Sequence, residues 1–442
     1  MARTSSREVI STQQQKIVAL AQMEPRKVLT TLAHHIDKVW MVEAYRRTRK
    51  DGAVGVDGVT AAEYEERLSE NLEDLLSRFK SGRYCAPPVR RVHIPKGGRG
   101  GETRPIGIPT LEDKVLQRAV LMVLELIYEQ DFMDCSYGFR PGRGAHQALA
   151  ALWRGLMEMG GGWVIDLDIR SYFDSIDHRQ LREILDQRVR DGVIRRALGK
   201  WMKAGVMESG AVHYPEAGTP QGGVISPLLS NLYLHEVLDR WFEHTVKPRL
   251  QGRACMVRYA DDVVMAFEQE TDARRVLAVL AKRFAKYGLQ LHPDKTQLVE
   301  FRPPGKGTPS GGSFDLLGFT HYWGRSRKGR WVIKRKTAKG RMARAVHRVG
   351  QWCRYWRHHP IREQHAALVR QLRGHYAYYG ITGNASALWR FYRQVERCWC
   401  KWLGRRSHRS GMTWERFVRL LIHYPLPPPR VVHSIYRGAA TR

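Results

Sequence analysis

The 442-residue chain is short of acidic residues. Its 43 Asp and Glu side chains face 74 Lys and Arg, which leaves a formal net charge of +31 at pH 7 with histidine neutral. Self-repulsion of that size disfavours a compact state, so a polyanionic partner is expected to compensate it. The shortage is greatest in residues 325–442, which hold 28 Lys and Arg but three acidic residues. A basic tail is often a solvated arm, but this one carries many aromatic residues, which such arms rarely do.

Cysteines and long apolar runs are also scarce. The six cysteines contain no C-x-x-C pair, which argues against a disulfide framework and against a zinc site. The longest apolar stretch, residues 119–127, is interrupted by Glu125 and is too short to span a bilayer. Residues 1–10 are polar and lack the apolar segment of a signal peptide. We therefore expect a cytoplasmic protein that is neither exported nor embedded in a membrane.

The spacing of apolar residues predicts an α+β body followed by a basic, aromatic helical domain, and the length allows two or three hydrophobic cores. Four apolar residues at helical spacing predict helix within the first 50 residues: Val28, Leu32, Ile36 and Val39. Thr110, followed by Asp113, marks the start of another helix. Further helices are expected at residues 63–79, 271–287, 341–355, 361–379 and 385–403. Strands are expected at residues 89–94, 163–169, 297–301 and 314–319, with a strand–turn–strand at 256–267.

Two aspartates share one face of the strand predicted at residues 163–169. Trp163, Ile165, Leu167 and Ile169 alternate, so Asp166 and Asp168 lie together on the other face. Aspartate is a poor strand former, and two on one face repel each other, which a divalent cation would relieve. The alternative is a sheet face that is simply solvated.

A second acidic pair stands at a predicted hairpin tip. Apolar runs flank a tight turn at Ala260–Asp261, so Asp261 and Asp262 are adjacent at the tip. Aspartate is common in ordinary turns, so the pair alone is only suggestive. Together with the aspartate strand it indicates nucleotidyl transfer, in which carboxylates from two elements hold two Mg²⁺ ions about 3.5–4 Å apart.

Residues 218–227 form a loop that is rich in glycine and proline. Such a backbone approaches a ligand closely or adopts special dihedral angles, although a plain loop has the same composition. Gln221 within it is an amide that can bond base or sugar edges, which favours contact with a template or a nucleotide.

These motifs, in this order, resemble the group II intron-encoded reverse transcriptase/maturase family over roughly residues 50–440. The similar blocks are residues 55–58, 92–96, 104–109, 137–142, 168–173, 220–222, 259–262, 291–296 and 317–319. The resemblance implies a right-hand polymerase: fingers and a palm with an antiparallel sheet, followed by an α-helical thumb/maturase domain. The implied boundaries are a helical extension at 1–50, fingers at 51–160, palm at 161–324 and the thumb/maturase (X) domain at 325–442.

The resemblance also implies roles for individual residues. Asp168, Asp261 and Asp262 would be the catalytic ligands of two Mg²⁺ ions, and Asp166 matches the family less well. Lys96 and Arg104 match contacts to the triphosphate, and Gln221 belongs to the template-grip loop. Tyr172 or Phe173 would block a ribose 2′-hydroxyl, with Tyr172 the better match. Lys295 would protonate pyrophosphate, unless it is an ordinary surface lysine.

The basic domain would bind RNA. About half of its aromatic residues are expected in the helical core, and the others would stack on RNA. Its expected RNA contacts are Arg341, Arg344, Arg348, Arg354, Arg373, Arg393 and Arg397. The C-terminal nuclease module of the longest family members has no match here, so nicking of a target strand is not expected of this chain.

Three functions remain open. The first is an intron-encoded enzyme that copies RNA into DNA and assists splicing and mobility of its intron; its partners would be template and intron RNA, a DNA primer or target, and dNTPs. The second is a free-standing relative in defence or repair. The third is a splicing-only RNA-binding maturase, which the complete set Asp168, Asp261 and Asp262 disfavours. The sequence leaves the cognate RNA and the oligomeric state open.

Overall fold

The computed structural model describes residues 2–23, 27–95, 103–208, 211–214, 218, 222–305, 311–406 and 411–434. Lys96 and Gln221, both predicted to contact nucleotide or template, lie outside these residues. The chain forms two compact units. The first unit comprises Met1–Ala148, Leu167–Met265 and Thr271–Thr296, and the second unit comprises Leu149–Asp166, Ala266–Glu270 and Gln297–Arg442.

The first unit combines helices with short strands. Its helices are α1 (Ala2–Met23), α2 (Lys38–Arg47), α3 (Ala61–Glu66), α4 (Leu68–Ser81), α5 (Leu111–Tyr128), α7 (His178–Asp186), α8 (Gly192–Met202), α9 (Ser226–Leu234) and α10 (Glu270–Lys286). Its strands are β1 (Val89–Pro95), β2 (Thr103–Ile108), β4 (Val206–Glu208), β5 (Ala211–His213) and β6 (Ala254–Tyr259). Short 3₁₀ turns are η1 (Ala33–His35), η2 (Tyr172–Ser175) and η5 (Lys247–Arg249), and π-helical turns are η3 (His235–Asp239) and η4 (Phe242–Val246).

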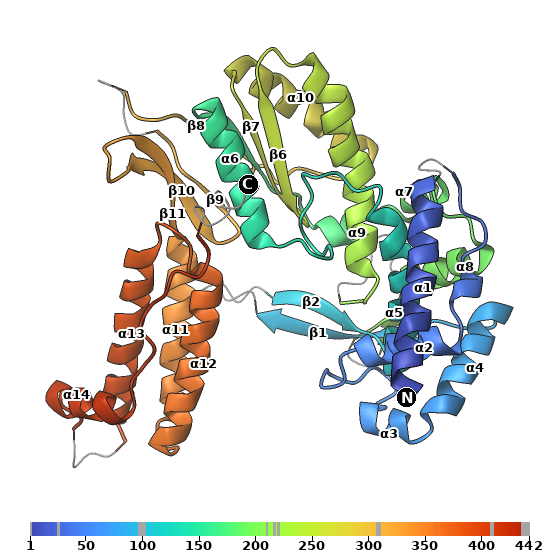
Figure 1. Cartoon of the computed structure of the whole chain (residues 1–442), viewed down its shortest axis with the longest axis horizontal. Helices are drawn as coiled ribbons and strands as arrows, with labels where there is room; N and C mark the ends of the chain where they lie inside the picture. The colour runs from blue at the N-terminus through green and yellow to red at the C-terminus, as the bar shows by residue number, and fades with distance from the viewer. Residues whose placement is uncertain are drawn as a thin grey trace. The chain divides into compact units, whose positions relative to one another are not determined.

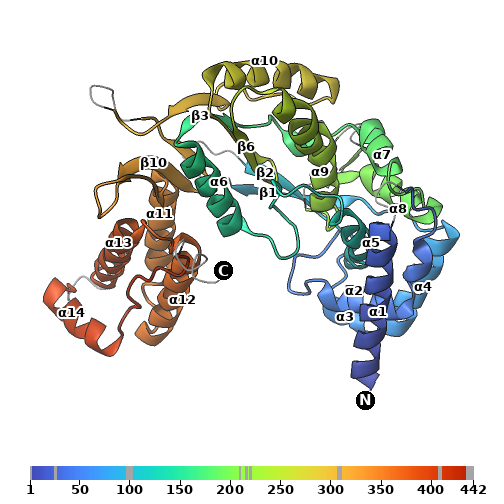
Figure 2. The ribbon, with the colours of Figure 1, turned by 45° about the horizontal axis from the view of Figure 1, so that its top comes forward.

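Helix α5 is the centre of the first unit's N-terminal core. The Thr110 hydroxyl accepts a hydrogen bond from the Asp113 N–H, which confirms the predicted helix start and satisfies a backbone donor that a helix N-terminus leaves open. Helices α1 and α2 pack against α5, and the Trp40 indole donates to the Ala119 carbonyl (2.9 Å). Figure 2 shows these helices gathered with α4.

Helix forms within the first 50 residues as α1 and α2, and Val39 lies in α2, but Val28, Leu32 and Ile36 lie outside both helices, so the prediction is wrong for the segment between them. The chain between α1 and α2 is mostly irregular, and its backbone donors are satisfied by a distant carboxylate: the Leu32 and Ala33 N–H groups donate to Asp191 (2.7 and 2.9 Å). Apolar spacing reports burial, and here an extended segment is buried. The helix predicted at 63–79 forms as two, α3 and α4, because the chain breaks at Arg67.

Three sheets organise the strands. The first unit holds a sheet of order β2-β1-β4-β5, in which β1 and β2 pair antiparallel with Ile94 opposite Arg104. A second sheet has the order β6-β7-β3-β8 and carries the candidate catalytic strands; its remaining members are β3 (Gly162–Leu167), β7 (Asp262–Phe267) and β8 (Gln297–Phe301). Helix α6 (Ala145–Met159) precedes β3. The strand–turn–strand predicted at 256–267 and the strand predicted at 297–301 are confirmed.

Besides β8 and most of α6 and β3, the second unit contains a small sheet and a helical bundle. Its sheet has the order β11-β10-β9, formed by β9 (Phe314–Leu316), β10 (Phe319–Arg325) and β11 (Trp331–Thr337). The helices are α11 (Lys339–Trp356), α12 (Ile361–Tyr379), α13 (Ala385–Leu403) and α14 (Trp414–His423). Figure 1 shows α11, α12 and α13 side by side, and the predicted bounds of α12 and α13 are confirmed to the residue.

The bundle has its own apolar core. Phe391, Trp399 and Tyr376 are buried there with Leu368 and Leu388, whereas Tyr355 and Trp389 remain 77% and 47% exposed. The basic region is therefore a packed domain and not a solvated arm. Among the helices that the structure describes, none has the length and apolarity to cross a membrane.

Candidate active site

The hairpin between β6 and β7 places Asp261 at its tip. Ala260, the residue before it, has φ = 56°, a left-handed conformation that is costly for a residue with a side chain. Gly138 lies directly against this turn, because a Cβ on Gly138 would stand 2.3 Å from the Ala260 nitrogen. A strained turn of this kind persists only where its surroundings hold it.

A buried arginine on β6, Arg258, stabilises the hairpin turn through hydrogen bonds. The Arg258 side chain is fully buried and forms a two-pronged ion pair with Asp239 (Nε–Oδ1 2.8 Å, Nη2–Oδ2 2.6 Å). Arg258 Nη1 also donates to the Ala260 carbonyl (3.1 Å) and to Asn231 Oδ1 (2.9 Å). Asn231 in turn donates to the Gly138 carbonyl (2.7 Å). This network connects α9, the following π-helical turn and the segment at Gly138 to the strained turn.

Asp168 follows β3, and the loop at 290–296 holds its backbone. The Asp168 carbonyl accepts from the His292 N–H (2.8 Å) and from the Thr296 hydroxyl (3.3 Å). The side chain of Lys295, in the same loop, points back at the carboxylate, with Nζ 3.2 Å from Asp168 Oδ2. Lys295 is therefore not an isolated surface lysine, although its side chain is 64% exposed.

The carboxylates of Asp168 and Asp261 come from separate elements, and the charge of Asp168 acts on Asp261. Burial raises the pKa of Asp261, and the negative charge of Asp168 raises it further, whereas Arg104 and Arg258 lower it. Asp262 is exposed at the start of β7. Arg104, Asp168, Asp261, Asp262 and Lys295 all belong to the first unit.

Two mutually repelling carboxylates suit a divalent cation, which would relieve the repulsion that Lys295 relieves in part. The complete predicted trio is not gathered as a ligand set, however. In the described ranges, no group of three or more His, Cys, Asp or Glu side chains is close enough to hold a metal ion. The donor chemistry of the Asp168–Asp261 pair therefore fits a hard cation such as Mg²⁺, and the third ligand stays a prediction.

Glycine permits the 218–227 loop to approach its neighbours. Gly222 has φ = 116°, and a Cβ there would stand 2.3 Å from the Gly107 carbonyl oxygen on β2. Gly218 donates to the Ile176 carbonyl (2.9 Å) beyond η2. Gly222 therefore lies beside the β1–β2 hairpin, which carries Arg104, and Gly218 lies beside the segment that follows Asp168. This close approach is the reason for its glycines, as the composition suggested.

Tyr172 and Phe173, the two candidates for blocking a ribose 2′-hydroxyl, differ in burial. Tyr172 is buried, at 3% exposure, and its hydroxyl donates to the Ser230 carbonyl (2.6 Å). A side chain fixed in the core cannot face an incoming nucleotide. Ser171 has φ = 44°, and this turn redirects the chain so that Phe173 is the half-exposed residue of the two.

The arginines predicted to bind RNA are all exposed on the second unit's helices: Arg341, Arg344, Arg348, Arg354, Arg373, Arg393 and Arg397. Arg354 lies over the ring of Trp402, with 5.8 Å from its Cζ to the ring centroid. Exposure and cation–π contact suit a nucleic-acid surface but do not by themselves identify one.

Sequence reasoning missed the pair Arg258–Asp239 and its partner Asn231. One signal was available: Arg258 interrupts an otherwise apolar strand directly before Tyr259, and a charge in a buried strand needs a partner. The identity of that partner was hidden, since Asp239 lies 19 residues away in a π-helical turn.

Comparison with known proteins agrees with this geometry. A family model described as reverse transcriptase (RNA-dependent DNA polymerase) matches residues 94–321. Protein YkfC of Escherichia coli K12 is 38% identical over 291 residues, which cover 58% of this chain and 75% of YkfC. The group II intron-encoded protein LtrA of Lactococcus lactis is 39% identical over 199 residues, 45% of this chain and 32% of LtrA. Nuclear intron maturase 4 of Arabidopsis thaliana is 29% identical over 138 residues, 31% of this chain and 16% of that protein. The chain thus spans three quarters of YkfC but only about a third of LtrA.

Proposed function

Because this chain belongs to the reverse transcriptase family, we propose that it synthesises DNA on an RNA template by two-metal-ion nucleotidyl transfer. The observation that carries the proposal is the pair Asp168 and Asp261, two carboxylates from separate elements, of which the first raises the pKa of the second while the charge of Arg104 lowers it. In the right-hand polymerase arrangement that we propose, residues 51–160 are the fingers, 161–324 the palm and 325–442 the thumb/maturase domain, after a helical extension at 1–50.

In this proposal Asp168, Asp261 and Asp262 hold two Mg²⁺ ions, which would activate the primer 3′-hydroxyl and neutralise the triphosphate. Arg104, and Lys96 before it, bind the triphosphate through charge-assisted hydrogen bonds. Gln221 positions the template or the nucleotide. The Lys295 ammonium, now held by Asp168, is released toward the leaving pyrophosphate and donates its proton there.

The direct test is primer extension. Purified protein with a DNA primer, an RNA template, dNTPs and Mg²⁺ is expected to give full-length complementary DNA, and the Asp168→Asn variant is expected to give none. Product length on a denaturing gel measures the outcome. If folded protein incorporates no nucleotide on several templates at low salt, the polymerase assignment fails, and that result favours the splicing-only maturase.

We also propose a role in splicing and mobility of an intron RNA, supported by the exposed arginines and aromatic residues of the second unit and by relatives named intron-encoded protein and intron maturase. A free-standing relative in defence or repair would carry the same polymerase site. Intron RNA that co-purifies with the protein and splices faster with it, at low Mg²⁺, distinguishes the first role from the second.

Discrimination between ribose and deoxyribose is proposed to rest on Phe173. Phe173→Ala is expected to raise incorporation of ribonucleotides relative to deoxyribonucleotides by at least about tenfold, because removal of the ring opens space for the 2′-hydroxyl. A tenfold change in this ratio corresponds to about 1.4 kcal/mol of activation free energy. Single-nucleotide incorporation with matched dNTP and rNTP measures the ratio.

Tyr172→Phe is the matched control. It removes only the hydroxyl that donates to the Ser230 carbonyl, and with it one buried hydrogen bond. This variant is expected to lower the melting temperature and to leave the sugar preference unchanged. An unchanged sugar preference in Phe173→Ala together with a relaxed one in Tyr172→Ala, which removes the ring, would assign the discrimination to Tyr172.

A further inference from the structure

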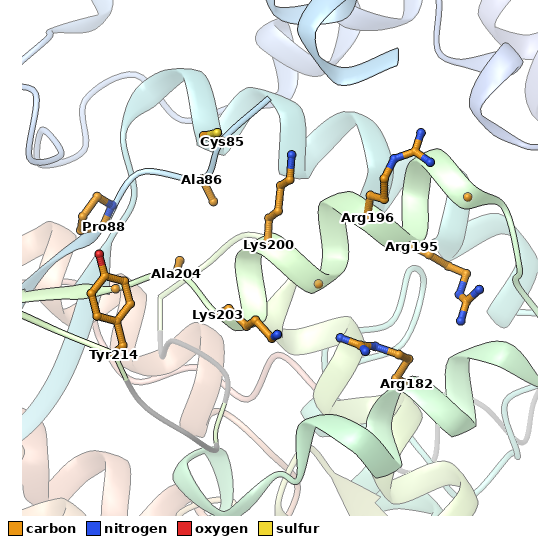
Figure 3. Close-up of a pocket in the computed structure, with 13 residues that line it drawn as sticks. Cys85, Ala86, Pro88, Arg182, Arg195, Arg196, Lys200, Lys203, Ala204 and Tyr214 are labelled. Atoms are coloured by element: carbon orange, nitrogen blue, oxygen red, sulfur yellow. The ribbon is translucent and has the colours of Figure 1, made fainter. Parts of the chain in front are cut away.

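A pocket of about 700 Å³ in the first unit is lined by five basic side chains, and among the described residues that line it none is acidic. Arg182 comes from α7, and Arg195, Arg196 and Lys200 come from α8, with Lys203 directly after it. The opposite wall is the segment Cys85, Ala86 and Pro88 that leads into β1, as Figure 3 shows. Of the residues assigned above to catalysis or nucleotide binding, those that the structure describes do not line this pocket.

Two of the five cations already have partners. Arg195 forms an ion pair with Asp186 (Nη2–Oδ2 2.6 Å), and Lys200 Nζ donates to the carbonyls of Gly82 (2.7 Å) and Tyr84. These contacts fix the wall of the pocket, and they do not compensate the charges of Arg182, Arg196 and Lys203.

Arg182, Arg196 and Lys203 are exposed, and in the part of the chain that the structure describes they make no ion pair. In Figure 3 the Arg182 and Lys203 side chains point toward one another across the opening. Like charges that converge without an acid between them repel, and an anion with several oxygens relieves the repulsion. The pocket therefore suits a ligand with more than one negative group.

An exposed aromatic ring stands at the same pocket. Tyr214 is 72% exposed, and its ring lies over Gly205, where a Cβ would stand 3.0 Å from Cε1. The ring thus rests on backbone and keeps a face open to solvent. An exposed ring beside converging cations is the combination that binds unpaired bases together with their phosphates.

We propose that this pocket binds single-stranded nucleic acid, with backbone phosphates on Arg182, Arg196 and Lys203 and a base stacked on Tyr214. The site lies apart from the catalytic aspartates and does not depend on their activity. A duplex fits it less well, because stacked and paired bases cannot reach Tyr214. An acidic protein segment would match the charges but would leave the ring unused.

The first test compares charge-matched variants. The triple variant Arg182→Gln, Arg196→Gln, Lys203→Gln is compared with Arg275→Gln, Lys282→Gln, Lys286→Gln, which removes three exposed charges from α10 in the same unit. Affinity for an unstructured RNA oligonucleotide is measured by fluorescence anisotropy over a range of salt. The pocket variant is expected to reduce the log–log salt slope by about 2, since each phosphate contact on a single strand contributes about 0.7. The α10 variant is expected to change the slope by less than half as much.

Tyr214→Ala gives a different signature. It is expected to weaken RNA binding about tenfold without changing the salt slope, because stacking involves no counterion release. Equal effects of the pocket and α10 variants, with no effect of Tyr214→Ala, would overturn the proposal. Melting curves of each variant show whether the fold is retained.

Alkylation of Cys85 can report occupancy of the pocket in the unsubstituted protein, because the Cys85 thiol is exposed at the pocket wall. Saturating RNA is expected to slow alkylation of Cys85 by iodoacetamide at least about fivefold, measured by mass spectrometry. If single-stranded DNA protects Cys85 as well as RNA does, the pocket recognises the phosphate backbone and the base. If RNA alone protects it, the pocket also recognises the ribose. Protection by polyglutamate but not by RNA, or by neither, overturns the proposal. No dNTP is present, so an inactive polymerase would not affect these results.

Discussion

DNA synthesis is expected to fall at least about a thousandfold when Asp261 is replaced by asparagine, while RNA binding persists. Asparagine keeps the shape and the turn propensity of aspartate but removes the charge that would bind Mg²⁺. A thousandfold loss is only about 4 kcal/mol of activation free energy, which the loss of one metal ligand readily reaches. The arginines that we propose bind RNA belong to the second unit, and none of the proposed catalytic aspartates is among the described residues that line the pocket proposed to bind single-stranded nucleic acid.

The same variant is expected to stabilise the metal-free protein. Because burial raises the pKa of Asp261, the folded state binds its proton more tightly than the unfolded state does, and the ionised form costs stability at neutral pH. The neutral asparagine side chain removes this cost. The gain in melting temperature should be full above the raised pKa of the folded state and should disappear as the pH falls toward the ordinary aspartate value of about 3.9.

Three measurements on one Asp261→Asn preparation separate the roles: complementary-DNA synthesis, RNA affinity and intron splicing at low Mg²⁺. Asp74→Asn, which alters an exposed carboxylate on α4, is the matched control and should change none of them. Retained synthesis would remove Asp261 from the active site. Simultaneous loss of all three activities, with a lower melting temperature, would mean that Asp261 is structural.

Local sequence rules predicted the elements that carry the site. Alternation identified the strand that leads to Asp168, and the turn signal placed Asp261 at a hairpin tip. Helical periodicity gave α12 and α13 because each has one buried face and ends where its pattern ends. These features depend on neighbours within a few residues.

The failures share one physical cause, which is that a distant segment decides the local conformation. The family resemblance favoured Tyr172 over Phe173, but Tyr172 is buried in the core, where its hydroxyl donates to the carbonyl of Ser230, 58 residues further along the chain. The segment before α2 has helical spacing, yet Asp191 takes its backbone donors. Neither effect is visible in a window of ten residues.

The buried pair Arg258–Asp239 is expected to have the second large effect, on both stability and synthesis. Asp239→Asn leaves the Arg258 charge buried without a counter-charge, so the free energy of unfolding should fall by about 3–5 kcal/mol. Chemical denaturation measures this loss. Removal of the exposed pair Arg179–Glu183 is the control, and it should cost less than about 1 kcal/mol.

Stability alone does not show that Arg258 positions the catalytic turn, and a charge-free double variant separates the two roles. Arg258→Met with Asp239→Leu removes both charges, so most of the stability lost in Asp239→Asn should return. The donors to the Ala260 carbonyl and to Asn231 are still missing, and the left-handed Ala260 loses the contact that holds it. We therefore expect kcat for nucleotide incorporation to stay at least about a hundredfold low, since displacement of a catalytic group by about 1 Å has that effect, while KM for dNTP and RNA affinity change little. If synthesis recovers together with stability, the pair serves only the fold, and Gly138 with Asn231 must hold the turn without it.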